Sequence, residues 1–295
     1  MLEKYKHGKL PITALLLSAS VWGMIWYPYR LLDQSGIGGE YATAITYSFA
    51  LILGLVVFRR NIRIAKIFNG KASLLLWIGL FAGIANIAYI LGIIHGEIMR
   101  VLLLFYLAPL WTIFFAQVLL NERLSMHGFF VITLSLTGAA FILWQPDQNF
   151  PLPQSYGDWM GLLGGFMFAL VNVLVRKDQG HDVALKSIAI WLGITLVGLV
   201  CSLNVSEPPD LNEIDLSLWA LLLIVGLMMF VSSVVLQYGL THTPANQAAV
   251  IMLFELVVAA ITAYFLANEA MTSREWIGGL LIISATLFSS KVNRA

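Results

Sequence analysis

Charged residues are scarce in this chain of 295 residues. They make up 11% of the sequence, whereas hydrophobic residues make up 59% and the mean hydropathy is +0.85. Soluble domains usually carry about 25% charged residues, so this composition excludes a water-soluble globular protein. The net charge of +1, without a basic patch interleaved with aromatic residues, gives no indication of a nucleic-acid partner.

Cysteines and catalytic motifs are also missing. Cys201 is the single cysteine, which excludes an internal disulfide. The chain has no Gly-Lys-Ser/Thr phosphate-binding loop, no His-Glu-x-x-His motif and no Gly-x-Ser-x-Gly motif. We therefore expect no ATP hydrolysis by this chain, no metal site, no cofactor and no catalytic residue.

Ten apolar segments follow one another along the chain, each of a length expected for a membrane-spanning helix. Backbone polar groups in lipid need partners within the protein, so each segment should be helical. Because the runs are continuous rather than alternating, we expect no membrane barrel. The sequence predicts an all-α integral membrane protein with ten transmembrane helices. The segments are approximately 10–32, 40–58, 73–95, 98–120, 127–144, 157–175, 184–203, 216–240, 246–267 and 274–291.

An internal repeat divides the chain into halves. The pair Asn121-Glu122 ends one apolar run, and 147 residues later the pair Asn268-Glu269 ends another. Two glycines, Gly79 and Gly92, and a histidine, His95, recur at the same offset. We predict two five-helix repeats, residues 1–147 and 148–295. Because five is odd, the second repeat enters the membrane from the opposite side, which makes the repeats inverted, as in many secondary transporters.

The basic residues predict the orientation. If the N-terminus is cytoplasmic, 14 of the 17 Lys and Arg residues fall on the inner side. The acidic residues between 207 and 215 then fall outside. Cytoplasmic loops carry an excess of Lys and Arg, so we expect a multi-pass protein of the cell inner membrane with both termini cytoplasmic. The first apolar run is longer than the core of a signal peptide, and we expect it to be retained.

Three stretches resemble the EamA-type module of the drug/metabolite transporter superfamily. They are Trp22-Gly23 in the first segment, GIIHGEIMRVLLLFYLAPLW at 92–111 and NERLSMHGFFVITLSLTGAAFIL at 121–143. The resemblance implies five plus five helices and secondary transport, with export of amino acids or related metabolites as the commonest activity. It also implies a cavity lined by the first, third, fourth, sixth, eighth and ninth segments. The second half departs from the pattern, since Leu256 stands where the first half has Pro109.

Glu255 lies near the middle of the segment 246–267. A charged side chain at the centre of a membrane costs about 2.5–3.5 kcal/mol on insertion scales, so such a residue usually faces the bundle interior or water. It could couple transport to a proton, or it could anchor a cationic or amino group of the substrate. The structural alternative is a protonated side chain that is hydrogen-bonded to a neighbouring helix.

Further candidates are aromatic and amide side chains within the apolar segments. Trp22 and Trp26 lie on one face of the first segment, and the second of these fits a cavity wall and the outer aromatic belt equally well. Asn86 and Asn172 fit a ligand contact or a structural clasp between helices. The candidate substrate-binding residues are Trp22, Trp26, Asn86, Tyr89, Tyr106, Asn172, Tyr238 and Glu255.

The sequence favours a secondary active transporter that exports a small organic metabolite by alternating access, coupled to protons through Glu255. The rival hypotheses are a non-transporting membrane scaffold or receptor, an efflux pump for drugs or amphipathic cations, and a membrane-embedded enzyme. The expected partners are a small-molecule substrate and the lipid bilayer, with the chain a monomer or a homodimer.

Overall fold

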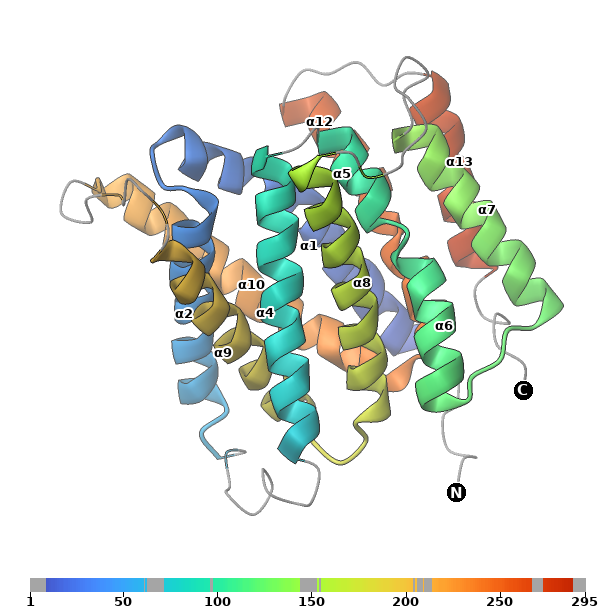
Figure 1. Cartoon of the computed structure of the whole chain (residues 1–295), viewed down its shortest axis with the longest axis horizontal. Helices are drawn as coiled ribbons and strands as arrows, with labels where there is room; N and C mark the ends of the chain where they lie inside the picture. Colours follow the sequence, from blue (N-terminus) through green and yellow to red (C-terminus); the bar gives the residue numbers. More distant parts are fainter. Residues whose placement is uncertain are drawn as a thin grey trace.

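The computed structural model describes residues 9–60, 62, 72–95, 98–143, 153, 155–203, 205, 209, 214–266 and 273–288. The elements in these residues are α-helices (Figure 1). They are α1 (Lys9–Gln34), α2 (Gly39–Val57), α4 (Ala72–His95), α5 (Ile98–Phe105), α6 (Ala108–Leu120), α7 (Met126–Leu143), α8 (Tyr156–Lys177), α9 (Val183–Ser202), α10 (Leu216–His242), α11 (Ala245–Met252), α12 (Phe254–Leu266) and α13 (Ser273–Leu287).

Length and composition make much of this chain able to cross a membrane. Seven helical segments of the described residues are long and apolar enough to do so, if α11 and α12 are taken as one run from Ala245 to Leu266. Three shorter apolar helices lie within α6, α7 and α13. The all-α membrane protein expected from the composition is therefore confirmed.

Two of the expected continuous helices are broken in the middle. Tyr106 and Leu107 separate α5 from α6, and Leu253 separates α11 from α12. Pro109 follows the first break and has no backbone N–H to continue the hydrogen-bond ladder. At the second break the ladder tightens locally, because the Leu253 N–H donates to the Val250 carbonyl at 3.2 Å. The sequence had predicted unbroken helices over both ranges.

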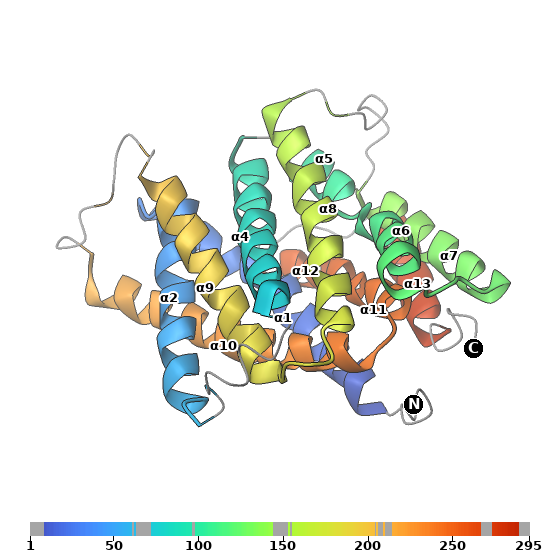
Figure 2. The same ribbon diagram turned by 60° about the horizontal axis from the view of Figure 1, so that its bottom comes forward.

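The helices interleave the two halves of the chain. Figures 1 and 2 place α4 beside α8, and α4 packs against both α8 and α9. In the same way α10 packs against α1 and α2. The helices α7 and α13 pair with each other at one edge of the bundle, away from α2 and α9 at the other edge (Figure 2). The interior is therefore built from both halves together.

Side-chain caps set where three helices of the second half begin. The Ser155 hydroxyl accepts from the Asp158 N–H while the Asp158 carboxylate accepts from the Ser155 N–H, which is a capping box at the start of α8. Asp182 accepts from the Leu185 N–H at 3.0 Å ahead of α9. Asp215 caps α10 in the same way. Each cap satisfies an N–H that has no partner within its own helix.

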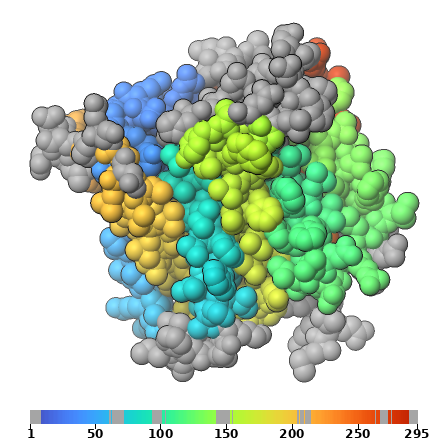
Figure 3. Space-filling view, in the orientation of Figure 1, coloured from blue at the N-terminus to red at the C-terminus, as the bar shows by residue number. Residues whose placement is uncertain are grey.

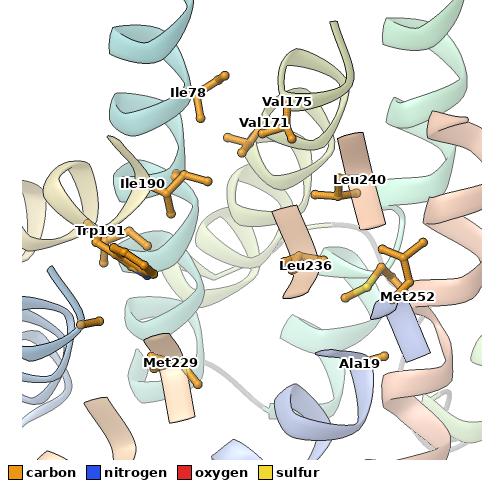
Figure 4. Packing of buried hydrophobic residues seen from close by; sticks show 14 of the residues in the cluster. Ala19, Ile78, Val171, Val175, Ile190, Trp191, Met229, Leu236, Leu240 and Met252 are labelled. Carbon is orange, nitrogen blue, oxygen red and sulfur yellow. The ribbon is translucent and has the colours of Figure 1, made fainter. Parts of the chain in front are cut away.

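A large apolar cluster fills the centre of the bundle. Trp191, which is fully buried, packs there with Ile190 and Met229, as Figure 4 shows. The exterior is also apolar. Figure 3 shows one face of the molecule, on which α9, α4, α8 and α6 lie next to one another. Large apolar side chains of α4 and α8, such as Trp77 and Trp159, are exposed. An apolar exterior around an apolar core suits a protein whose solvent is lipid.

Candidate functional site

A central cavity of about 80 Å³ lies where nine helices converge. Its walls come from α1, α2, α4, α5 and α8 to α12. A wider hollow of about 550 Å³ lies between the end of α1 and the start of α10, and none of the described residues in its lining is charged. We therefore place the site in the central cavity, which contains Glu255. The polar and aromatic residues that line the central cavity are Trp22, Tyr47, Asn86, Tyr89, Phe105, Phe168, Asn172, Ser233, Gln237 and Glu255.

Glu255 occupies the first turn of α12, directly after the helix break at Leu253. The hydroxyl of Tyr106, which is the first residue of the other helix break, donates a hydrogen bond to its carboxylate. Tyr106 and Leu253 also belong to one buried cluster with Leu256. The two helix breaks therefore meet each other beside the cavity, with the carboxylate between them.

A close approach of α1 places that carboxylate at the cavity wall. A Cβ atom on Gly23 would lie 2.6 Å from the Glu255 carbonyl oxygen and 2.8 Å from the Val258 Cβ. Only glycine fits at this crossing, because any side chain would push the helices apart. One residue earlier, the Trp22 side chain lines the cavity. The Trp22-Gly23 pair therefore has two roles. The glycine lets α12 pack closely against α1, and the tryptophan side chain forms part of the cavity wall.

Several polar atoms at the cavity are buried without a hydrogen-bond partner. Among the described residues they include the Trp22 Nε1, the Asn86 Oδ1 and the Gln237 Oε1. The Asn86 Nδ2 donates to the Tyr47 hydroxyl at 3.4 Å, which turns its oxygen the other way. An unsatisfied buried polar atom costs about 1–3 kcal/mol, and in native proteins such atoms often mark a binding site or a water site.

The cavity collects most of the residues that the sequence singled out. Trp22, Asn86, Tyr89, Asn172 and Glu255 line it, and Tyr106 reaches it through its hydrogen bond to the carboxylate. That these six bind a substrate stays a prediction.

Two of the predicted residues lie elsewhere. Trp26 is not in the lining; its Nε1 donates to the Thr262 hydroxyl at 3.1 Å and clasps α1 to α12. The ring of Tyr238 lies 4.4 Å from the His242 ring near the end of α10, while its neighbour Gln237 faces the cavity.

The sequence missed part of the lining. Tyr47 of α2 and Ile190 and Ile194 of α9 contribute to the walls, although these two segments were not expected there. The signal for Tyr47 was its phenol within an apolar segment, four residues after Thr43. The isoleucines gave no signal, since they are typical of any membrane helix.

A second polar region lies about one helical turn further along α8 and α10, a rise of about 6 Å. We call it the helix-end network and define it as Glu122, Arg176, Lys186 and Thr241. The Arg176 Nη1 donates to the Thr241 carbonyl at 2.7 Å, and its Nε lies 3.6 Å from the Glu122 Oε1. The other Glu122 oxygen accepts from the Ala245 N–H at 3.0 Å. The network thus ties α6, α8, α10 and α11 together.

Lys186 extends this network into the interior. Its side chain is fully buried, and its Nζ donates to the Val175 carbonyl at 3.0 Å and to the Thr241 hydroxyl at 3.1 Å. Nearby, the buried Asp178 Oδ2 and His181 Nδ1 lie within hydrogen-bond distance of each other, at 2.7 Å. Buried polar groups are tolerated when they are hydrogen-bonded, as the Lys186 and Asp178 side chains are here.

The turn after α6 directs Glu122 into the network. Asn121 has a φ of 56°, in the left-handed region that asparagine tolerates better than most residues. Its own N–H and that of Glu122 both donate to the Ala116 carbonyl, which closes the helix. This explains one copy of the repeated Asn-Glu pair. The other copy, Asn268-Glu269, lies outside the described residues.

Helices with an apolar exterior around a polar cavity, and helix breaks that meet at a carboxylate, are the architecture of a multi-pass membrane transporter. The chain belongs to the EamA-like transporter family, whose sequence model matches residues 9–144 and again residues 155–291. The resemblance noted in the sequence is therefore confirmed, and the protein is a transporter rather than an enzyme.

Relatives include transporters of opposite direction. An uncharacterized transporter of Archaeoglobus fulgidus is 27% identical over 220 residues, which covers 73% of this chain and 75% of that protein. A pseudopaline exporter of Pseudomonas aeruginosa is 23% identical over 73% of this chain and 74% of the exporter. An S-adenosylmethionine uptake transporter of Rickettsia felis is 23% identical over 92% of this chain and 93% of that protein.

The fold also occurs among solved structures, for example in one crystal structure. It is 15% identical, has a TM-score of 0.75, and the match covers 95% of this chain and 97% of that one. At this identity the likeness concerns the fold alone.

Proposed function

We propose that this protein is a secondary active transporter that moves a small organic metabolite across the cell inner membrane by alternating access. The observation that carries the proposal is the position of Glu255, in a central cavity and at the meeting point of two helix breaks. Broken helices at mid-membrane supply substrate and ion sites in several transporter folds. A scaffold or receptor would have no need of a carboxylate there.

Inverted repeats underlie the proposed cycle. The breaks at Tyr106 and Leu253 are 147 residues apart, the same offset that relates the Asn-Glu pairs. The packing of α1 against α10 has its counterpart in α8 against α4, and that of α4 against α9 in α10 against α2. These equivalences support repeats at 1–147 and 148–295, with ten transmembrane helices. The excess of Lys and Arg on one side supports a cytoplasmic position for both termini.

Glu255 is the proposed coupling residue. A carboxylate is less easily ionised when it is cut off from water and more easily when the cavity is wet. Protonation therefore favours one conformation over another, which is the requirement for coupling. The hydrogen bond from Tyr106 gives the ionised form one fixed partner on the opposite helix break.

The helix-end network is the proposed closure on the cytoplasmic side. Ligand sites usually enclose about 300–1,000 Å³, whereas the central cavity holds about 80 Å³. A substrate therefore requires the helices to separate. The contacts of Arg176 with Glu122 and with the Thr241 carbonyl join α6, α8 and α10 beyond the cavity, so opening towards that end must break them.

The relatives include both an exporter and an uptake transporter, so the direction rests on the family expectation of export. The expected cargo is an amino acid or a related metabolite. An efflux pump for amphipathic cations is the second candidate, favoured by the carboxylate and the aromatic walls of the cavity.

A transport assay without an assumed substrate tests the proposal. Proteoliposomes loaded with a small-metabolite extract are diluted into buffer under an imposed pH gradient, and the lumen is analysed by mass spectrometry over time. The expected result is the loss of a restricted set of compounds, faster than from protein-free liposomes and dependent on the gradient. Equal loss from both kinds of liposome would instead support the scaffold or receptor.

A further inference from the structure

The charge in the lining of the central cavity is of one sign, negative. Glu255 is the one ionisable acid in its lining, and none of the described lining residues is Lys, Arg or His. The nearest cations are Arg176, one turn after Asn172 on α8, and Lys186, one turn before Ile190 on α9. Arg176 is engaged with Glu122 and the Thr241 carbonyl, and Lys186 with the Val175 carbonyl and the Thr241 hydroxyl. A carboxylate on a ligand would enter this cavity beside another carboxylate and without a counter-charge.

Aromatic rings form the wall around that negative charge. The Tyr89 and Phe105 rings meet edge-on at 5.0 Å, and Phe105 lies 5.5 Å from Phe168, so one aromatic surface runs from α4 through α5 to α8. Tyr47 and Trp22 add rings from α2 and α1. Such faces attract organic cations, with a strength that rises when the site is shielded from water.

The unpaired polar atoms at the cavity are further hydrogen-bonding partners for a ligand. The Gln237 side chain is 3% exposed, and its Oε1 lacks a partner at the cavity, as does the Asn86 Oδ1. Both are acceptors and match the N–H donors of an ammonium group. The unpaired Trp22 Nε1 is a single donor, and it matches one neutral acceptor such as a hydroxyl or an ether oxygen.

We infer that the central cavity binds an organic ammonium ion that carries no carboxylate, with the ammonium group between Glu255, Asn86 and Gln237. This inference rests on the proposed transport function and narrows its cargo. It replaces the expectation of a free amino acid, whose own carboxylate has no cation to meet here. It also assigns to Asn86 and Gln237 a role in selecting the ligand by the charge of the ligand and not by its shape.

A ligand series with one constant ring and a changing charge tests this inference. The probes are 2-phenylethylamine, phenylalanine and phenylacetate, and the readout is thermal unfolding of the purified, unaltered protein over a range of concentrations. We expect the amine to stabilise the protein with a Kd at least tenfold lower than that of phenylalanine, and phenylacetate to give no shift. The Glu255→Gln variant should lose the shift with the amine. The Glu40→Gln variant, which removes a carboxylate outside the cavity at the start of α2, should keep it.

Comparable binding of phenylalanine or phenylacetate would overturn the inference, as would a failure of the amine to bind or an unchanged shift in Glu255→Gln. The charge series on the unaltered protein decides the matter by itself if that variant proves unstable. The outcome is separable from that of the transport assay. Flux of zwitterions or anions from the extract would refute the inferred ammonium ligand and support the proposed transport function. Amine binding without any flux would support the ammonium ligand and refute the transport function.

Discussion

The central cavity and the helix-end network lie about one helical turn apart. The polar groups of the network have hydrogen-bond partners, whereas several polar atoms of the cavity do not. In the network, Arg176 contacts Glu122 and the Thr241 carbonyl, and Lys186 donates to the Thr241 hydroxyl, at distances of 2.7–3.6 Å. In the cavity, polar atoms of three side chains stay unpaired beside a carboxylate.

This difference distinguishes polar groups that stabilise the fold from polar groups that bind a ligand. An unpaired buried group lowers stability, and proteins keep such groups mainly where a ligand or water completes them. A saturated network stabilises the conformation in which it forms. We therefore assign the network to holding one end of the bundle closed and the cavity to recognition of the substrate. The predictions below test whether that division is correct.

Breaking the network should have the largest effect on stability. Arg176→Leu removes the donor to the Thr241 carbonyl and leaves the mostly buried Glu122 without its cation. We expect the free energy of unfolding to fall by about 2–3 kcal/mol, measured by thermal or denaturant unfolding in detergent. The double variant Glu122→Gln/Arg176→Leu should recover about 1 kcal/mol of this loss. A change below about 0.5 kcal/mol in the single variant would show that the network does not hold the bundle.

A pair of matched substitutions on α10 should shift stability in opposite directions. Gln237→Leu removes an amide with an unpaired oxygen, so the free energy of unfolding should not fall and should rise by up to about 1 kcal/mol. Thr241→Val removes an acceptor from the buried Lys186 ammonium, and the free energy of unfolding should fall by about 1 kcal/mol. Transport should drop at least tenfold in Gln237→Leu alone. If Gln237→Leu unfolds more easily than Thr241→Val, the glutamine is a structural clasp and the comparison fails.

Tyr106→Phe should have the smallest effect. It removes one hydroxyl from the Glu255 carboxylate and keeps the ring in its cluster. We expect the free energy of unfolding to change by less than about 1 kcal/mol. Transport should persist within about threefold, a barrier change of about 0.7 kcal/mol, with a changed dependence on pH. The pH dependence of flux in proteoliposomes, compared with the unaltered protein, provides the measurement. An unchanged pH profile would show that Tyr106 does not influence the titration of Glu255.

Sequence reasoning gave the membrane class from hydropathy, which is a local property of the chain, and the family from short stretches of sequence. It also found Glu255, since one carboxylate in an apolar run is a strong signal. It missed the break at Leu253, where no proline or glycine interrupts the pattern. It did not predict the contact of Arg176 with Glu122, which depends on how four helices meet.

A second difficulty was to predict which side chains of a helix face the cavity. Gln237 and Tyr238 are adjacent, and a rotation of about 100° separates a residue that lines the cavity from one that does not. The sequence ranked the tyrosine as the candidate, whereas the structure turns the glutamine to the cavity. Ser233, Gln237 and Thr241 follow one another at four-residue spacing on α10, which places them on one helix face. This polar stripe was the signal for the face that points inward.

The response of transport to a pH gradient in Glu255→Gln tests the central claim most directly. Glutamine keeps the size and hydrogen-bonding capacity of the side chain and fixes its neutral state. Flux should be measured in proteoliposomes with and without an imposed gradient, for both proteins at matched amounts. We expect Glu255→Gln to insert normally, to lose at least tenfold of its gradient-driven net flux and to keep any substrate exchange that does not require a proton. A variant that responds to the gradient as the unaltered protein does would contradict the account, and Glu255 would then be a hydrogen-bonding clasp between the two helix breaks.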